Sequence, residues 1–214
     1  MVRRRLAREG LRPVRESLVV LLRRMARSAI VLFLGSVLFL SSTARASDPC
    51  MSDRLLPAIQ AIEVKFRGWR LITLSALSDE DQRTWRQERN GDCPSIALGD
   101  FDGSGRRQYA ALLISKKATP VQGETYSTRQ MRLLHVVSAQ DGAYSFSTIT
   151  QDVTTLIPVV YRSPPGQYEY FKTNSDVKTV IQISTDVIVV EVMESSSTAY
   201  FFKKGKFVAL TLSF

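Results

Sequence analysis

From residue 93 onward, apolar and polar residues of this chain alternate with a period of two. Runs of strand length recur there, separated by turn pairs such as Asp141-Gly142 and Lys204-Gly205. This alternation is typical of strands with one buried face, and their short connections favour antiparallel neighbours. The predicted strands cover residues 95–98, 109–114, 131–137, 144–149, 177–183, 187–193, 198–202 and 207–212.

Two segments before residue 93 follow helical spacing instead. In residues 52–64, Leu55, Ile59 and Ile62 fall on one helical face. Residues 78–88 begin with Ser78 and three acidic residues, a combination that favours a helix N-terminus. We therefore predict an α+β fold in which N-terminal helices pack on a largely antiparallel β-sheet.

The first 46 residues have the pattern of a secretory signal peptide. Nine arginines in residues 1–27 precede an uncharged apolar run at 29–40 and the small-residue ending Ala44-Arg45-Ala46. The run is shorter than the roughly 20 residues that span a bilayer, so membrane contact is expected only before cleavage. We predict cleavage after Ala46 and a single exported domain at 47–214. An alternative is that translation starts at Met25, because the sequence from Met25 onward is by itself an ordinary start of a signal peptide.

Removal of this leader changes how the net charge of +9 is interpreted. Of the 29 basic and 20 acidic residues, residues 1–46 hold ten arginines and two glutamates, which leaves 19 and 18 in residues 47–214. Because a nearly neutral domain has no excess of basic charge to form a nucleic-acid footprint, we predict that nucleic acid is not a partner.

The two cysteines, Cys50 and Cys93, both lie in the predicted exported domain. An even count in an oxidising compartment indicates one disulfide; two separate thiols are the alternative. Together with the leader, this pair predicts a periplasmic or secreted protein.

Spaced oxygen side chains and turn glycines coincide in residues 100–108, which we call the acidic loop. A calcium ion needs six to eight oxygens, and a tightly curled chain presents every second residue inward. Gly103 and Gly105 suit such curling, and the apolar runs on either side predict a strand-loop-strand. The ligand positions would be the side chains of Asp100, Asp102, Ser104 and Gln108 and the carbonyl of Arg106.

The Gly-Asp-Phe-Asp-Gly-Ser-Gly sequence at 99–105 resembles the FG-GAP and VCBS class of calcium loops, found between strands in propeller repeats and in many exported bacterial proteins. The resemblance implies the same five ligand residues. Ser104 and Gln108 replace carboxylates usual in that class, so the expected cofactor is either none or weakly bound calcium. The loop occurs once, so a propeller is not implied. Cys93-Pro94 and the final Tyr-Phe-Phe-Lys-Lys-Gly-Lys-Phe hairpin resemble exported bacterial proteins of unknown function.

Catalytic and binding candidates are few. His135 is the only histidine and shares a strand face with Met131 and Val137, which favours a packing role; a small secreted hydrolase with a site near His135 is the alternative. Aromatic residues flank a Pro-Pro-Gly turn, and Tyr161, Tyr168 and Tyr170 are candidates for a surface that binds an envelope protein or a glycan. The leading hypothesis is an exported, non-enzymatic domain with one structural loop.

Overall fold

The computed structural model describes residues 48–139, 141–171, 178–193 and 195–213. The chain divides into two units, residues 1–46 and 47–214, and every described residue belongs to the second unit. The predicted signal peptide, its cleavage point and the alternative start at Met25 lie outside the described residues.

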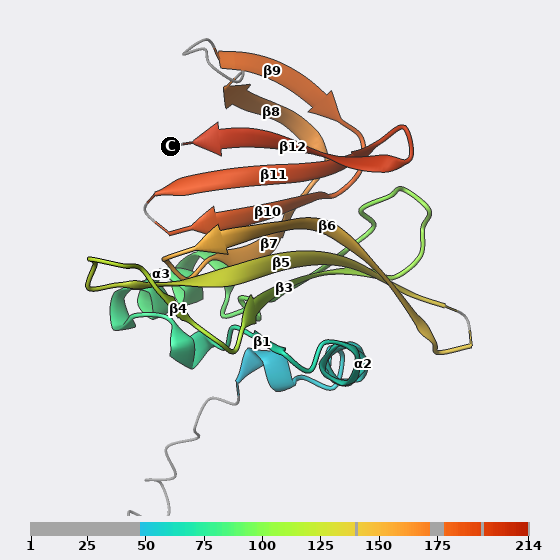
Figure 1. The fold of residues 1–214 in the computed structure, drawn as a ribbon. Helices are drawn as coiled ribbons and strands as arrows, with labels where there is room; N and C mark the ends of the chain where they lie inside the picture. Colours follow the sequence, from blue (N-terminus) through green and yellow to red (C-terminus); the bar gives the residue numbers. More distant parts are fainter. Residues whose placement is uncertain (1–47, 140, 172–177, 194, 214) are drawn as a thin grey trace, which may run out of the picture. The chain divides into compact units, whose positions relative to one another are not determined.

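Twelve strands, the number within the described residues, form two antiparallel sheets of six (Figure 1). The first sheet is β1 (Trp69–Leu71), β2 (Ile96–Gly99), β3 (Gln108–Ser115), β4 (Thr119–Pro120), β5 (Ser127–Ser138) and β6 (Tyr144–Thr154). The second sheet is β7 (Val159–Ser163), β8 (Gly166–Phe171), β9 (Lys178–Ile183), β10 (Val187–Val192), β11 (Ser196–Lys203) and β12 (Lys206–Ser213). Its strand order is β7-β10-β11-β12-β8-β9, and Figure 1 shows these strands in that succession.

Helices make up a small part of the described chain. The two α-helices found there are α2 (Leu56–Lys65) and α3 (Asp79–Arg89), with 3-10 turns η1 (Pro49–Met51) and η2 (Leu74–Ala76). Ser78 caps α3 by accepting a hydrogen bond from the Asp81 N–H, and Asn90 ends it in a left-handed conformation. Neither helix has the length and apolar character needed to span a membrane, as far as the described residues go.

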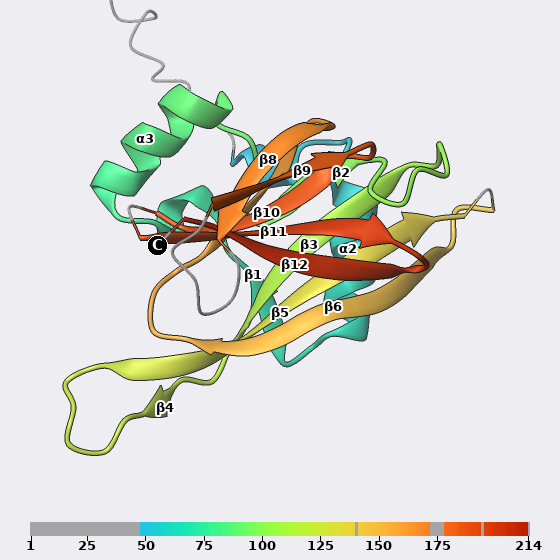
Figure 2. The same cartoon turned by 90° about the horizontal axis from the view of Figure 1, so that it is seen from above.

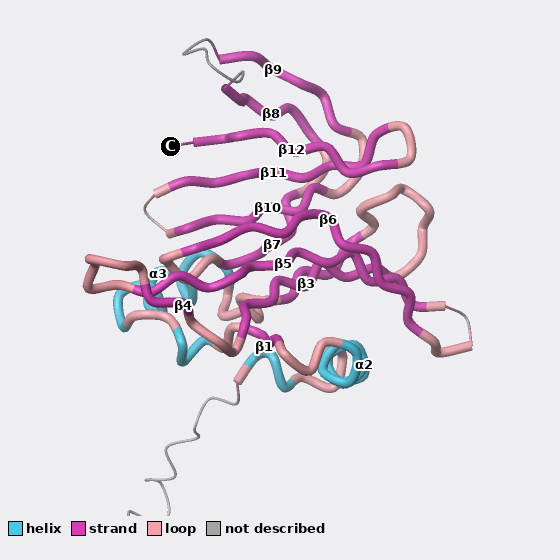
Figure 3. The backbone as a smooth tube through the Cα atoms, in the orientation of Figure 1, coloured by secondary structure: helices cyan, strands magenta, loops and turns pink. Residues whose placement is uncertain are grey.

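The predicted α+β class is wrong. Strand predominates throughout the described chain in Figure 3, and the strands form two sheets, whereas the prediction had one sheet covered by helices. The reason lies in β3, whose two faces are both buried. Ala110, Leu112 and Ile114 belong to a core cluster shared with β7 and β10 of the second sheet. Thus the largest apolar cluster is built mainly by the two sheets, and Figure 2 shows α2 and α3 at separate places around them.

The predicted disulfide between Cys50 and Cys93 is confirmed. It joins residues 43 positions apart and connects η1 to the segment that enters β2. Both cysteines are buried in a second apolar cluster, where Ile59 and Ile62 of α2 pack against the other face of β3. A disulfide is typical of proteins that fold in an oxidising compartment.

Candidate functional site

The acidic loop connects β2 to β3, as the strand-loop-strand prediction required. Gly99 pairs with Gln108 across the antiparallel ladder, so the loop closes directly above a strand pair. Gly103 and Gly105 both have φ of +73°, a backbone region that side chains disfavour, which explains why glycines occupy these positions. The curled chain predicted from the sequence is therefore present.

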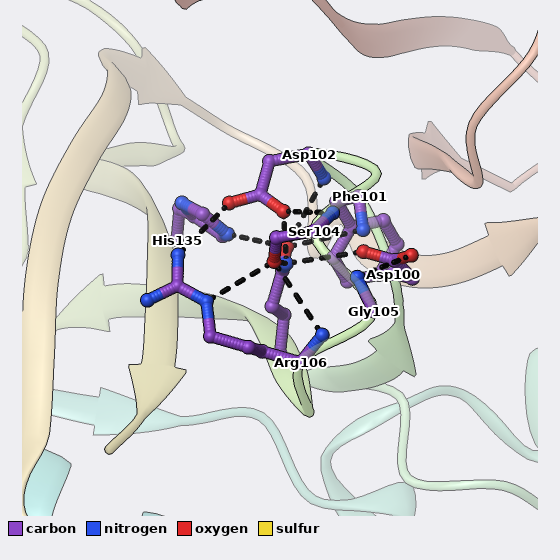
Figure 4. Close-up of polar contacts among 8 residues, drawn as sticks. Asp100, Phe101, Asp102, Ser104, Gly105, Arg106 and His135 are labelled. Atoms are coloured by element: carbon purple, nitrogen blue, oxygen red, sulfur yellow. Dashed lines mark hydrogen bonds and ion pairs between the residues drawn. The ribbon is translucent and has the colours of Figure 1, made fainter. Parts of the chain in front are cut away.

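Inside the loop, side-chain oxygens accept hydrogen bonds from the loop's own backbone. The Ser104 N–H donates to Asp102 Oδ1 at 2.9 Å, and the Gly105 N–H donates to Asp100 Oδ2 at 2.9 Å. Figure 4 shows Asp100, Asp102 and Ser104 grouped together at the centre of these contacts. Such side-chain to backbone bonds hold a tight turn in place without any further ligand.

The Gln108 side chain lies at the point where the loop's oxygens converge. Its Nε2 lies 3.2 Å from Asp100 Oδ1 and 3.0 Å from Ser104 Oγ, and is also within hydrogen-bond distance of Asp102 Oδ1, so its two hydrogens are shared among three oxygens. Gln108 is fully buried, with no exposed surface. An amide nitrogen thus faces the three oxygens that a bound cation would need.

Backbone contacts determine which end of this amide faces the oxygens. The N–H groups of Phe101 and Asp102 both point at Gln108 Oε1, at 3.1 and 3.2 Å. Two donors require an acceptor, so this atom is the carbonyl oxygen and the other is the NH₂ group. Turning the amide over would set two backbone donors against a third donor and would remove the hydrogen bonds that the NH₂ group gives to the loop oxygens.

His135 of β5 completes the contacts of Gln108. Its Nε2 lies 2.8 Å from Gln108 Oε1, and because an amide oxygen only accepts, this ring nitrogen carries the proton and donates. The ring is 7% exposed and meets the Phe207 ring of β12 edge to face, with centroids 4.9 Å apart. His135 therefore connects the loop to both sheets.

The electrostatics of the site favour a neutral His135 beside an ionised Asp102. Burial lowers the pKa of His135; Asp102 opposes this change and Arg106 adds to it. For Asp102, burial acts to raise the pKa, but hydrogen bonds from Ser104 and Gln108 outweigh it, so the pKa is lowered. The Arg106 guanidinium lies 3.5 Å from Asp102 Oδ2 and donates to Ser104 Oγ from Nε at 3.1 Å.

The acidic loop is also attached to the second sheet through Asp186, which precedes β10. The Asp100 N–H donates to Asp186 Oδ2 at 2.9 Å, across 86 positions of sequence. Gly99 allows this approach, since a Cβ there would lie 2.8 Å from Asp186 Oδ2 and 2.9 Å from the Phe101 ring. Sequence reasoning missed Asp186, because nothing in its local pattern distinguishes it from an ordinary turn aspartate.

The donor set does not fit calcium in this arrangement. Asp100, Asp102 and Ser104 contribute suitable oxygens, but Gln108 directs hydrogens at the position of the ion and its oxygen is taken by backbone N–H groups. Among the described residues, no three His, Cys, Asp or Glu side chains are grouped so that they could hold a metal. The predicted ligand residues are thus brought together, but around an amide.

The predicted aromatic surface is largely packed into the protein. Tyr161, Tyr168 and Tyr170 are all partly buried. Tyr161 lies in β7 against Trp85, with ring centroids 6.3 Å apart. In β8, the Tyr168 hydroxyl donates to Ser163 Oγ at 2.8 Å. These side chains support the sheet, and binding of an envelope protein or a glycan by them stays a prediction.

A cleft that sequence reasoning missed lies between β2, β7, the end of α3 and the segment around η1. Its volume is about 570 Å³, and its charged side chains come from positions far apart in the sequence. We call it the arginine cleft because Arg54, Arg89 and Arg162 line it. The other lining residues are Pro49, Ser52, Leu55, Asp92, Cys93, Ile96, Ala97, Leu98, Val160 and Tyr161.

No protein-family model, curated protein or solved structure matches this chain. The resemblance of residues 99–105 to FG-GAP and VCBS loops therefore stays a prediction from that motif. Functional conclusions for this protein depend on the contacts of its own side chains.

Proposed function

We propose that this protein is an exported, non-enzymatic domain, periplasmic or secreted, whose acidic loop is a structural connection held by Gln108 and not by calcium. The observation that carries this proposal is the donation from Gln108 Nε2 to the oxygens of Asp100, Asp102 and Ser104. A neutral NH₂ group there gives the loop oxygens hydrogen bonds where a calcium loop gives them a metal ion.

The cost of replacing this amide with an ion supports the proposal. A cation at the same position would require the Gln108 side chain to leave, which would free the buried N–H of Phe101 and the N–H of Asp102. Each buried donor left without a partner costs about 1–3 kcal/mol. Two carboxylates and one hydroxyl form a weak calcium site to begin with, so this cost is large in comparison.

The contacts of His135 support a packing role over catalysis. Its Nε2 donates to an amide oxygen, and its ring is enclosed by Gln108 and Phe207. A hydrolytic histidine instead takes a proton from a nucleophilic hydroxyl, and neither Gln108 nor Phe207 offers one. The alternative of a hydrolase near His135 gains no support from these contacts.

Export is supported by the leader pattern and by the disulfide. N-terminal sequencing of the protein purified from cells that export it tests this part of the proposal. We expect the purified protein to begin at Ser47, after Ala46. A folded cytoplasmic product that keeps residues 1–46 would contradict export.

Thermal unfolding tests the role of the loop. A ligand that binds only the folded state raises the unfolding midpoint as its concentration exceeds its dissociation constant. We expect the same midpoint in 10 mM calcium chloride and in EGTA. A midpoint that rises steadily with calcium, and not with an equal concentration of magnesium, would show that the loop is a calcium site.

The Gln108→Asp variant provides a matched control for this measurement. It removes the NH₂ group and adds a carboxylate at the position where FG-GAP and VCBS loops usually have one. We expect this variant to be less stable in EGTA and to regain stability in calcium. With a dissociation constant near 1 mM, 10 mM calcium would restore about 1.4 kcal/mol.

A further inference from the structure

The arginine cleft has the size and wall composition of a small-molecule site. Its volume of about 570 Å³ falls within the roughly 300–1,000 Å³ typical of ligand pockets. Pro49 and Leu98 are partly exposed and supply apolar surface to the cleft, whereas Leu55, Ile96, Ala97 and Val160 are buried behind it. The Cys50–Cys93 disulfide fixes one wall, because Cys93 itself lines the cleft.

The polar groups of the cleft are mainly cationic. Three arginines reach it from three separate segments, and Asp92 is the one acidic side chain among the described lining residues. Arg54 is exposed, and no ion pair involves it within the described chain. Guanidinium groups that line one cleft from different segments are suited to bind a carboxylate or a phosphate.

The two other arginines have acidic neighbours but keep donors for a ligand. Arg89 lies 3.9 Å from Glu191 Oε2, and Arg162 lies 3.6 Å from Asp186 Oδ2. Both separations exceed the 2.7–2.9 Å typical of a charge-assisted hydrogen bond. Each guanidinium has five N–H donors, so these loose pairs orient the side chains and leave hydrogens available.

Arg89 is held in position before any ligand arrives. Its guanidinium carbon lies 3.6 Å from the centroid of the Tyr161 ring, a close cation–π contact. Trp85 in turn packs against the Tyr161 ring, with ring centroids 6.3 Å apart. Burial and Glu191 raise the pKa of Tyr161, so its phenol stays neutral and does not itself repel an anion.

We propose that the arginine cleft binds a small organic anion, with its carboxylate or phosphate group held by Arg54, Arg89 and Arg162 and its apolar part against Pro49 and Leu98. This inference goes beyond the proposed function, because it assigns a ligand class to a surface separate from the acidic loop. The partly exposed apolar side chains of Pro49 and Leu98 favour an organic anion over an inorganic one, since a bare phosphate would leave them in water.

Fluorescence titration with 8-anilinonaphthalene-1-sulfonate tests the proposal, and its neutral analogue N-phenyl-1-naphthylamine serves as the paired probe. We expect saturable binding of the sulfonate at one site per protein and clearly weaker binding of the neutral probe. Arg54→Gln and Arg162→Gln should each weaken sulfonate binding about tenfold, because each removes one charged hydrogen-bond partner. Arg83→Gln, an exposed arginine of α3 outside the cleft, should stay within about twofold of the wild type.

Three further readings make the test decisive. The thermal midpoint of each variant must match the wild type, which shows that lost binding is not lost folding. Raising sodium chloride from 50 to 500 mM should weaken binding of the sulfonate but not of the neutral probe, since salt screens the arginines. Displacement by 1-naphthoate or by 1-naphthyl phosphate distinguishes the two anion sources, and either result supports the proposal.

Three results would overturn it. Sulfonate binding that is unchanged in both arginine variants would show that the cleft does not hold the anion. Equal affinity for the neutral probe would show that apolar contact alone drives binding. Displacement by uncharged 1-naphthol as effective as that by 1-naphthoate would lead to the same conclusion.

Discussion

The acidic loop and the arginine cleft are both rich in charged and polar side chains, but they differ in how these groups are paired. In the loop, both ends of the buried Gln108 amide are hydrogen-bonded. Its oxygen accepts from two backbone N–H groups, and its nitrogen donates to side-chain oxygens of the loop. In the cleft, Arg89 and Arg162 face acids at 3.6–3.9 Å and stay open to solvent. Closely paired groups stabilise a fold, whereas loosely paired groups beside a cavity are available to a ligand.

The largest effect should follow from breaking the loop's pairing. Gln108→Met keeps nearly the same volume but leaves the N–H groups of Phe101 and Asp102 without their acceptor, and Asp100 and Asp102 each lose one hydrogen bond. We therefore expect a loss of about 3–5 kcal/mol in the free energy of unfolding. Urea unfolding measures it. Gln167→Met, on an exposed strand position, is the matched control and should change stability by no more than about 0.5 kcal/mol. Similar losses in both variants would contradict the account.

Removal of the disulfide should weaken the cleft wall but not the loop. For a bridge that spans 43 positions, Cys50→Ala with Cys93→Ala should lower stability by about 3–4 kcal/mol, since the unfolded chain gains freedom. Urea unfolding of this variant, compared with the wild type with and without reductant, measures the loss. An unchanged unfolding midpoint after reduction of the wild type would contradict the expectation.

Gly99→Ala should separate the acidic loop from the second sheet. The added Cβ would meet Asp186 Oδ2 at 2.8 Å and the Phe101 ring at 2.9 Å, so we expect a loss of about 1–3 kcal/mol. Gly68→Ala is the matched control, because a Cβ at Gly68 has nothing within 4 Å. Thermal unfolding of both variants compares them. Equal midpoints would show that the Asp100–Asp186 contact does not require a glycine here.

Acid should weaken the loop's contacts through His135. Burial lowers the folded-state pKa of this histidine below 6.5, so the unfolded chain takes up a proton that the folded protein excludes. The free energy of unfolding should therefore fall as pH drops from about 6.5 to the folded-state pKa and become level below it. Urea unfolding from pH 7.5 to 5 measures this slope. His135→Gln removes the only histidine, and an unchanged slope in that variant would contradict the assignment.

The smallest effect on stability is expected in the cleft. Arg54→Gln and Arg162→Gln remove exposed charges with loose or no ion pairs, so unfolding should change by no more than about 0.5 kcal/mol. Thermal unfolding of the two variants beside Gln108→Met gives the comparison between the regions directly. A loss above about 1 kcal/mol would show that these arginines are structural, as the loop residues are.

Local patterns predicted part of this structure. Period-two alternation located most of the strands, and the glycines at 103 and 105 indicated a curled loop between two of them. An even cysteine count predicted the disulfide. The α+β class was wrong because alternation does not reveal how many sheets form, and β3 is buried by different layers on its two faces.

The chemistry of both regions depends on long-range contacts that local patterns do not show. Gln108 was assigned as a ligand from its spacing, but its orientation follows from the N–H groups of Phe101 and Asp102. One feature of the sequence pointed to this difference from a calcium loop: residue 108 is an amide, where FG-GAP and VCBS loops usually have a carboxylate. Asp186 contacts both Asp100 and Arg162, and these contacts depend on how the second sheet packs, which the local sequence does not show.

A crystal structure of the protein grown in 10 mM calcium chloride is the most direct test of the central claim that Gln108 takes the place of a cation. We predict that Gln108 Nε2 remains within hydrogen-bond distance of the oxygens of Asp100, Asp102 and Ser104, with no ion between them. A calcium ion coordinated by these oxygens at 2.3–2.6 Å, with the Gln108 amide turned away, would contradict the account.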